Sequence, residues 1–170
     1  MGAWHLGRAL STNGGPAATR ELLAKAVHED YVRRRRSEGQ LRQYDPALAA
    51  WEDLPESLRN SNLSQVADIE RKLDAIGCEV AYEGGESAAL QLAPEEIELL
   101  ARMEHARWTE ERLSDGWSYG AERDVAAKRS PGLVPWNELS EELRDLDRDA
   151  VRAIPQLLAK AGLSAVRRQG

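Results

Sequence analysis

Phenylalanine is absent from the 170 residues, cysteine occurs once, and no apolar run approaches the length of a membrane span. The single cysteine, Cys78, excludes an internal disulfide bond and a zinc site built from several cysteines. A membrane-spanning helix needs about 20 consecutive apolar residues, so the sequence predicts no contact with a membrane. The segment Met1–Gly15 lacks the basic start and long apolar core of a secretory signal, which favours a cytoplasmic location.

An excess of positive charge is also absent. Lys and Arg total 23, Asp and Glu total 29, and the formal net charge is −6. Proteins dedicated to nucleic-acid binding usually carry a basic excess, so we expect no nucleic-acid partner. The run Arg33–Arg36 does not change this expectation. Four consecutive residues of a helix point in four directions, and Glu29, Asp30 and Glu38 offset their charge, so we interpret the run as a solvated face.

Signatures of catalysis and of cofactor binding are lacking as well. A zinc-protease H-E-x-x-H motif would need a second histidine where Val32 and Thr109 stand. The sequence contains no P-loop, no G-x-G-x-x-G segment and no nucleophile elbow. We therefore predict a protein that is not an enzyme, with no catalytic residues, no metal ligands and no cofactor.

Tryptophan and tyrosine are present in numbers that contrast with the missing phenylalanine. There are five Trp and four Tyr. Both side chains combine an apolar body with a polar group, which suits exposed clefts and interfaces. Compositional drift without functional meaning stays open as the alternative.

The chain contains two related copies of one unit. Shifting the sequence by 77 residues, and further along by 85, brings identical residues together. Examples of these pairs are Leu23/Leu100, His28/His105, Arg35/Arg112, Gly39/Gly116, Pro46/Pro131, Trp51/Trp136, Leu54/Leu139, Ile69/Ile154, Leu73/Leu158 and Gly77/Gly162. The register changes because the segment 116–131, here called the GW loop, holds eight residues more than its counterpart 39–46. We predict an N-terminal tail at 1–15, a divergent repeat at 16–84 that ends in a Gly-rich linker, and a second repeat at 85–170.

Each copy predicts the same order of elements. A long first helix comes first and begins in the second copy at Pro94, a residue favoured in the first helical turn. A short helical turn and a closing helix follow, for which Asn62 and Asp147 are the expected N-caps. Pro155 lies inside the pattern of the last helix and should kink it.

Short extended segments are expected after the closing helices, at 78–82 and 163–166. The predicted fold is therefore mainly α, with two helical repeats related by an approximate twofold axis and short β segments.

The second copy carries an ordered set of motifs. It reads Glu104-His105-Ala106-Arg107-Trp108, then Gly116-Trp117-Ser118-Tyr119-Gly120, Asp124, Pro131-x-Leu133-Val134-Pro135-Trp136 and Leu139. These motifs resemble the ryanodine-receptor repeat, or RyR domain, whose signature is an H-x-x-W helix, a GW-x-YG turn, a following Asp and a P-x-L-V-P element. The first copy resembles a divergent repeat that lacks the GW-x-YG turn.

The resemblance implies a non-catalytic module. Tandem repeats of this family resemble pseudo-twofold clamps that hold an adenine nucleotide between their halves, with the tryptophan of the GW turn against the base. Trp117 takes that role here, and Trp51, Tyr44 or Tyr31 could supply the ring that the first copy lacks. Similar pairs occur in bacterial proteins, sometimes behind a nucleotide-binding domain. The implied partners are a nucleotide-like small molecule, an upstream nucleotide-binding or effector domain, and a second copy in a homodimer.

A stripe of residues on the first helix of each copy supports a ligand site. His105, Trp108 and Arg112 share one helix face by their spacing, and Tyr31 and Arg35 share the same face in the first copy. Such a stripe offers a stacking surface and a guanidinium group for a phosphate. Alternatively, the histidine and the aromatic residues pack against the GW loop and hold it in place.

The GW loop combines aromatic and cationic side chains. They are Trp117, Tyr119, Arg123, Lys128 and Arg129. This combination suits a planar base joined to phosphates, although the aromatic residues could instead fill the space beneath the loop. Two functions stay open: a sensing module for an anionic, nucleotide-derived molecule, and a structural or interaction module whose aromatic residues anchor a dimer or a partner domain.

Overall fold

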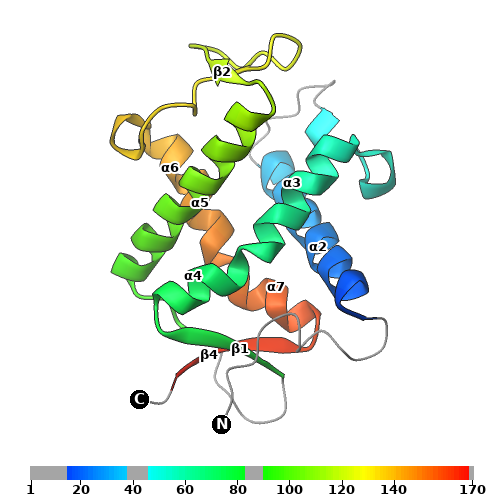
Figure 1. Ribbon diagram of the computed structural model, residues 1–170, viewed down its shortest axis with the longest axis vertical. Helices are drawn as coiled ribbons and strands as arrows, with labels where there is room; N and C mark the ends of the chain where they lie inside the picture. Colours follow the sequence, from blue (N-terminus) through cyan, green and yellow to red (C-terminus); the bar gives the residue numbers. More distant parts are fainter. Residues whose placement is uncertain (1–14, 38–45, 83–89, 169–170) are drawn as a thin grey trace. The chain divides into compact units, whose positions relative to one another are not determined.

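The structure, a computed structural model, describes residues 15–37, 46–82 and 90–168 and is mainly helical with short strands (Figure 1). This confirms the predicted fold class. The helices are α2 (Gly15–Ser37), α3 (Glu56–Ala67), α4 (Ile69–Ala75), α5 (Pro94–Ser114), α6 (Glu141–Arg152) and α7 (Ile154–Lys160), with 3₁₀ turns η1 (Pro46–Leu48), η2 (Trp51–Asp53) and η3 (Trp136–Glu138). Tyr44, the linker and all but the last residue of the N-terminal tail lie outside the described residues. Of the helices described, none has the length and hydropathy needed to cross a membrane.

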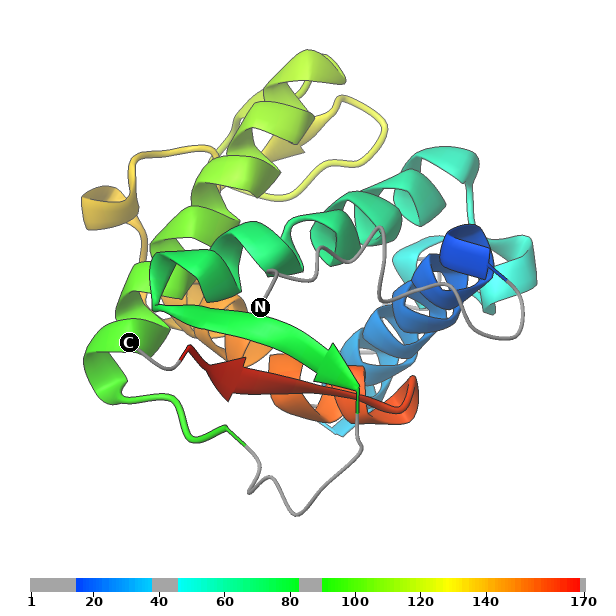
Figure 2. The ribbon, with the colours of Figure 1, turned by 60° about the horizontal axis from the view of Figure 1, so that its bottom comes forward.

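Two compact units make up the chain. The first comprises residues 1–90 and 155–170, and the second comprises residues 91–154. The strands β1 (Cys78–Tyr82) and β4 (Leu163–Arg167) form an antiparallel pair in the first unit (Figure 2). The units therefore do not coincide with the predicted repeats, because the closing strand of the second copy pairs with the closing strand of the first.

The register of this strand pair follows the repeat. Val80 lies opposite Ala165, 85 residues further along, and these two residues form the centre of the pairing. Cys78 pairs with Arg167, and Tyr82 pairs with Leu163. Exchanging the two strands therefore leaves the pairing unchanged, so this ribbon has a local twofold symmetry.

The elements after the GW loop recur 85 residues apart. This spacing relates η2 to η3, α3 to α6, α4 to α7 and β1 to β4. Gly77 and Gly162 each adopt a φ of 68° between helix and strand, which only glycine adopts without strain. Both glycines end their helices as the sequence predicts.

Apolar side chains form a core in each unit. In the first unit α2 packs on α3 and α4 packs on β1, and the fully buried side chains include Leu23, Val66 and Leu73. In the second unit α5 packs on α6, and Leu100 and Val151 are buried there. Helix α5 begins at Pro94 as predicted.

The predicted N-caps are wrong. Asn62 lies inside α3, where its amide donates to the Leu58 carbonyl at 3.0 Å, and Asp147 lies inside α6. The N-cap of α6 is Ser140, whose hydroxyl accepts a hydrogen bond from the Leu143 N–H. Hydroxyl and carboxylate side chains have similar cap propensities, so composition alone does not select among them.

The helix is interrupted for one residue, Ala153, where the kink is expected. Helix α6 ends at Arg152, and Pro155 lies in the first turn of α7, where its missing N–H costs no helical hydrogen bond. Helices α3 and α4 break at the corresponding place, around Asp68, where no proline occurs. The break is thus a feature of both copies and does not depend on the proline.

Candidate ligand-binding site

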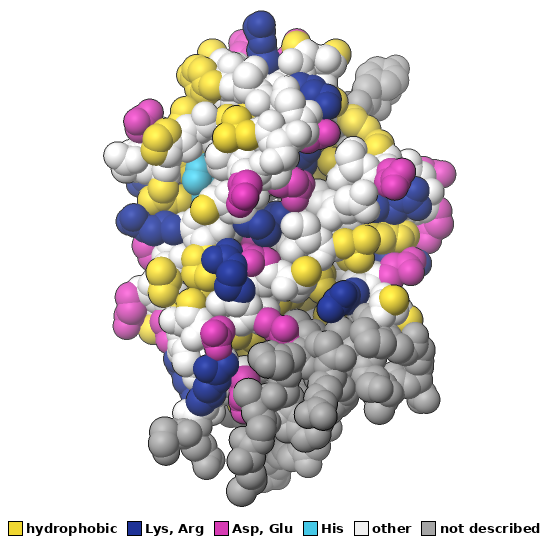
Figure 3. Space-filling model, viewed as in Figure 1, with side chains coloured by type: hydrophobic (Ala, Val, Ile, Leu, Met, Phe, Trp, Pro, Cys, Tyr) yellow, Lys and Arg dark blue, Asp and Glu magenta, His cyan; other side chains and the backbone are white. Residues whose placement is uncertain are grey.

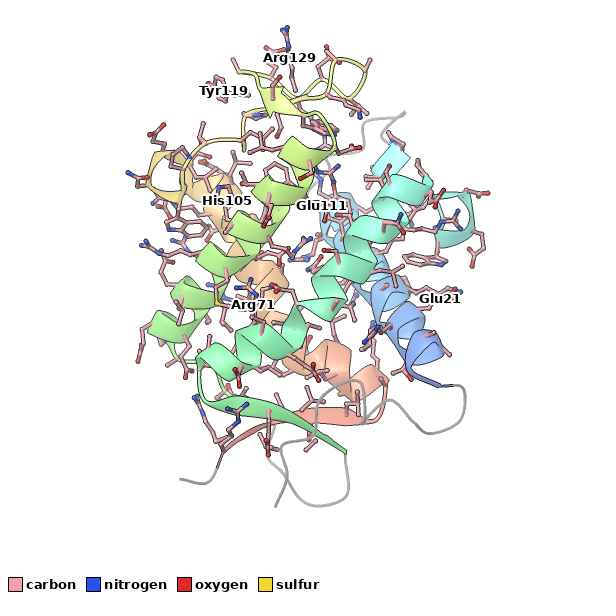
Figure 4. The ribbon with its side chains drawn as sticks, in the orientation of Figure 1. Glu21, Arg71, His105, Glu111, Tyr119 and Arg129 are labelled. Atoms are coloured by element: carbon pink, nitrogen blue, oxygen red, sulfur yellow. The ribbon has the colours of Figure 1, made fainter. Side chains whose placement is uncertain are left out.

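The GW loop follows directly from α5 and is closed by two short parallel strands. These are β2 (Ser118–Tyr119) and β3 (Arg129–Ser130), in which Ser118 lies opposite Arg129. The Ser118 N–H donates to the Lys128 carbonyl at 2.9 Å. Figure 4 shows Tyr119 and Arg129 at the loop, beyond the end of α5, and His105 further back along that helix. The site residues predicted in the second copy therefore belong to one helix and the loop that follows it.

A series of contacts between aromatic rings and guanidinium groups connects α5 to the GW loop. His105 stacks on Trp108 with 6.1 Å between ring centroids and 26° between planes. The Arg112 guanidinium carbon lies 5.9 Å from the centroid of Trp108 and 5.2 Å from that of Trp117. The Arg123 guanidinium carbon lies 5.7 Å from the same Trp117 centroid. The predicted stripe on α5 is thus one continuous set of contacts that reaches the loop.

Trp117 lies beneath the loop. Its side chain is only 8% exposed, and its indole Nε1 donates to the Asp115 carboxylate at 3.1 Å. The Lys128 ammonium group donates to the Asp115 carbonyl at 2.6 Å and lies 3.4 Å from a carboxylate oxygen of the same residue. Asp115 therefore fixes both the indole and the far end of the loop. Sequence reasoning missed it, although a carboxylate two residues before the tryptophan was a visible signal.

Arg112 of α5 and Arg123 of the loop, here called the arginine pair, both lie over the Trp117 ring. Within the described ranges, neither guanidinium forms a hydrogen bond or an ion pair. The nearest acids have other partners, because Glu111 binds Arg107 at 2.7 Å and Asp115 binds Trp117 and Lys128. Burial lowers the pKa of Arg112, Glu111 opposes this shift, and the positive charge of Arg123 adds to it. Asp115 also opposes the shift, so acidic groups lie near the pair, but none of those described forms an ion pair with it.

The remaining loop residues are more open to solvent. Tyr119 is 59% exposed and Arg129 is exposed, with its side chain lying against Gly120. Leu113 and Val125, on either side of Trp117 in the chain, are also exposed, at 57% and 42%. This end of the second unit presents both apolar and cationic groups to solvent.

His105 is buried, and both of its ring nitrogens have polar partners. Its Nε2 donates to the Val134 carbonyl at 2.8 Å, and its Nδ1 lies 3.4 Å from the Asp147 carboxylate. Burial alone would lower the His105 pKa, but the bonds to Asp147 and Val134 raise it above its usual value. Because Nε2 must carry a proton to bind a carbonyl, it cannot act as a base toward Thr109, whose hydroxyl is 3.4 Å away. The histidine ties α5 to the P-x-L-V-P segment and to α6.

The first-copy residues lie in the first unit and repeat part of this geometry. The Nε2 of His28 binds the Ala49 carbonyl at 2.8 Å, and its ring lies 6.1 Å from that of Trp51. The Arg35 guanidinium lies 6.0 Å from the Tyr31 centroid, as Arg112 lies over Trp108. Trp51 is 8% exposed and therefore offers little ring surface to a ligand.

A buried ion pair joins two residues of α5, Glu104 and Arg107. The Glu104 carboxylate accepts two hydrogen bonds from the Arg107 guanidinium, and both side chains are at most 10% exposed. The described ranges contain no group of three or more His, Cys, Asp or Glu side chains placed to hold a metal ion.

One comparison with known proteins identifies part of the chain. Residues 90–167 match the family model of the RyR domain. The match covers α5, the GW loop, η3, α6, α7 and β4, and thus includes every site residue predicted in the second copy. This part of the chain is therefore similar to the RyR domain.

Proposed function

We propose that this chain is a non-catalytic sensing module whose RyR-like part binds an anionic, adenine-nucleotide-like or nucleotide-derived small molecule beside the GW loop. The observation that carries the proposal is the arginine pair. Two guanidinium groups lie over one indole ring, and no carboxylate among the described residues forms an ion pair with either, although the charges of Glu111 and Asp115 act on Arg112. Guanidinium groups bind phosphate oxygens through paired hydrogen bonds, and each charged hydrogen bond contributes about 1.5–3 kcal/mol.

Local charge, not the net charge of −6, governs such a site. On the face drawn in Figure 3, acidic and basic side chains of the described residues are interspersed. The Debye length at physiological salt is about 8 Å, so distant acidic groups are largely screened from a ligand at the arginine pair. A cytoplasmic location, as the sequence predicts, forms part of the same proposal.

A thermal-shift experiment tests the function. We expect ADP to raise the melting temperature of the full chain, because a ligand that binds only the folded state stabilises it. The shift should shrink with added salt and disappear in Arg123→Glu. The matched control is Arg33→Glu, an exposed arginine of α2 that pairs with Asp30 at 2.9 Å and should leave the shift intact. A shift caused only by neutral or cationic compounds, insensitive to salt and to Arg123→Glu, would reject the proposal.

A second candidate function is supported by the exposed apolar groups near the loop. Leu113, Tyr119 and Val125 are each more than 40% exposed, which suits an interaction module that docks a partner domain or a second copy of the chain. If the chain has this second function, Tyr119→Ala should weaken the association of the chain with its partner or with a second copy, as measured by analytical ultracentrifugation. ADP should then cause no thermal shift, either in the parent chain or in Arg123→Glu.

A further inference from the structure

The aromatic rings beside the arginine pair already have partners. Trp117 is 8% exposed and carries both guanidinium groups over its ring. Trp108 is half-buried and stacks against His105, with Arg112 also over its ring. A base that stacks on either indole would have to displace a guanidinium group or the histidine ring. The rings therefore hold the arginines in position and do not present an open stacking surface.

Unlike the rings, the N–H donors of the arginine pair have no hydrogen-bond partner among the described residues. Each guanidinium carries five N–H groups, and none of them is used within the described part of the chain. Burial lowers the pKa of Arg112, and the positive charge of Arg123 adds to this shift, whereas Glu111 and Asp115 oppose it. An anion with two negative charges would relieve the repulsion between the guanidinium groups and fill donors that are otherwise left to water.

Other arginines over tryptophan rings in the same unit show the contrast. The Trp136 ring has Arg102, Arg144 and Arg148 within 5.8 Å of its centroid. Each of these arginines is paired with a carboxylate, Arg102 and Arg148 with Glu98 and Arg144 with Glu141. Among the arginines that lie over tryptophan rings in the described part of this unit, only Arg112 and Arg123 form no ion pair with a carboxylate.

We infer that this site recognises the phosphate chain of its ligand and not the base. The inference rests on the proposed function and narrows its ligand class to soluble compounds with two linked phosphate groups, with or without a nucleoside. The phosphate oxygens accept hydrogen bonds from Arg112 and Arg123. Trp117 stays buried and packs against both guanidinium groups, so a base contributes little to the affinity.

Isothermal titration of the full chain with inorganic pyrophosphate, ADP and adenosine tests this inference. Pyrophosphate should bind within about threefold of ADP, and adenosine should bind at least about 150-fold more weakly, which is the loss expected when two charged hydrogen bonds are missing. Arg123→Gln and Arg112→Gln should each weaken pyrophosphate binding about tenfold or more. Arg102→Gln is the matched control on α5, because that arginine also lies over a tryptophan but is paired with Glu98. It should change the affinity less than twofold.

The outcomes separate the two proposals. Binding of ADP that Arg123→Gln weakens, with no binding of pyrophosphate, would overturn the phosphate inference and leave the nucleotide-binding function standing. Failure of both ADP and pyrophosphate to bind would overturn the proposed function itself. Circular dichroism of each variant establishes that it is folded, and if Arg112→Gln fails to fold, Arg123→Gln, on the loop, decides the result.

Discussion

Replacing His105 with alanine should destabilise the protein more than the same change at His28, because only His105 faces a carboxylate. The substitution leaves the Val134 carbonyl without its donor and Asp147 without the imidazole 3.4 Å away. It also removes a ring that lies 6.1 Å from Trp108 and 5.8 Å from Trp136. His28 binds a carbonyl at the same 2.8 Å distance and lies beside one tryptophan, Trp51.

The magnitude follows from these contacts. A buried carbonyl that loses its donor costs about 1–3 kcal/mol, and lost contacts between rings cost about 0.5–1.5 kcal/mol. Asp147 is 18% exposed, so water can replace part of its lost hydrogen bond. We expect His105→Ala to lower the free energy of unfolding by about 3 kcal/mol, and His28→Ala to lower it by about 2 kcal/mol.

The two variants should also differ in their dependence on pH. The folded-state pKa of His105 is raised by Asp147 and the Val134 carbonyl against the effect of burial, so the folded protein holds the His105 proton more tightly than the unfolded chain does. The resulting stabilisation is fully present below the unfolded pKa near 6.5 and is lost as the pH rises through the higher folded pKa. His105→Ala should remove this decline above pH 6.5, whereas His28→Ala should retain it.

Urea unfolding followed by circular dichroism between pH 5.5 and 8.5 measures both effects. The reasoning would be refuted by equal losses of stability in the two variants together with an unchanged pH dependence in His105→Ala. That result would mean that the Asp147 carboxylate does not raise the pKa of His105 in the folded protein.

Two further changes probe the frame of the site. Glu104→Gln should lower the free energy of unfolding by about 2 kcal/mol in the same urea assay, because Arg107 loses its buried carboxylate partner but keeps Glu111 at 2.7 Å. A loss below about 0.5 kcal/mol would contradict the importance of the Glu104–Arg107 pair. Gly116→Ala should cost about 1 kcal/mol, since φ is +81° there and an added Cβ meets no atom within 4 Å, so that backbone strain is the only penalty. Differential scanning calorimetry that found Gly116→Ala as stable as the parent would show that this conformation is not required.

Much of the fold was predictable from the sequence because its signals are local. Pro94 begins α5, and Gly77 and Gly162 end their helices at positive φ, as a residue without a Cβ does readily. The strands at 78–82 and 163–167 follow those glycines as expected. Helix caps were less predictable, because Ser140 and Asp147 both have the chemistry of a cap and only the packing of α6 assigns the roles.

The tertiary structure alone decided how the site is assembled. The sequence placed Trp108 and Arg112 on one face of α5 by helical spacing, and it placed Trp117 and Arg123 in the loop. It did not determine that both guanidinium groups meet over a buried Trp117, because that contact depends on how the loop folds back on its helix. Asp147 likewise reaches His105 only because α6 packs on α5, and β4 reaches β1 only because a segment near the middle of the chain meets one near its C-terminus. Contacts between segments far apart in sequence leave no periodic pattern, so only the folded chain reveals which of the described charged groups form ion pairs and which do not.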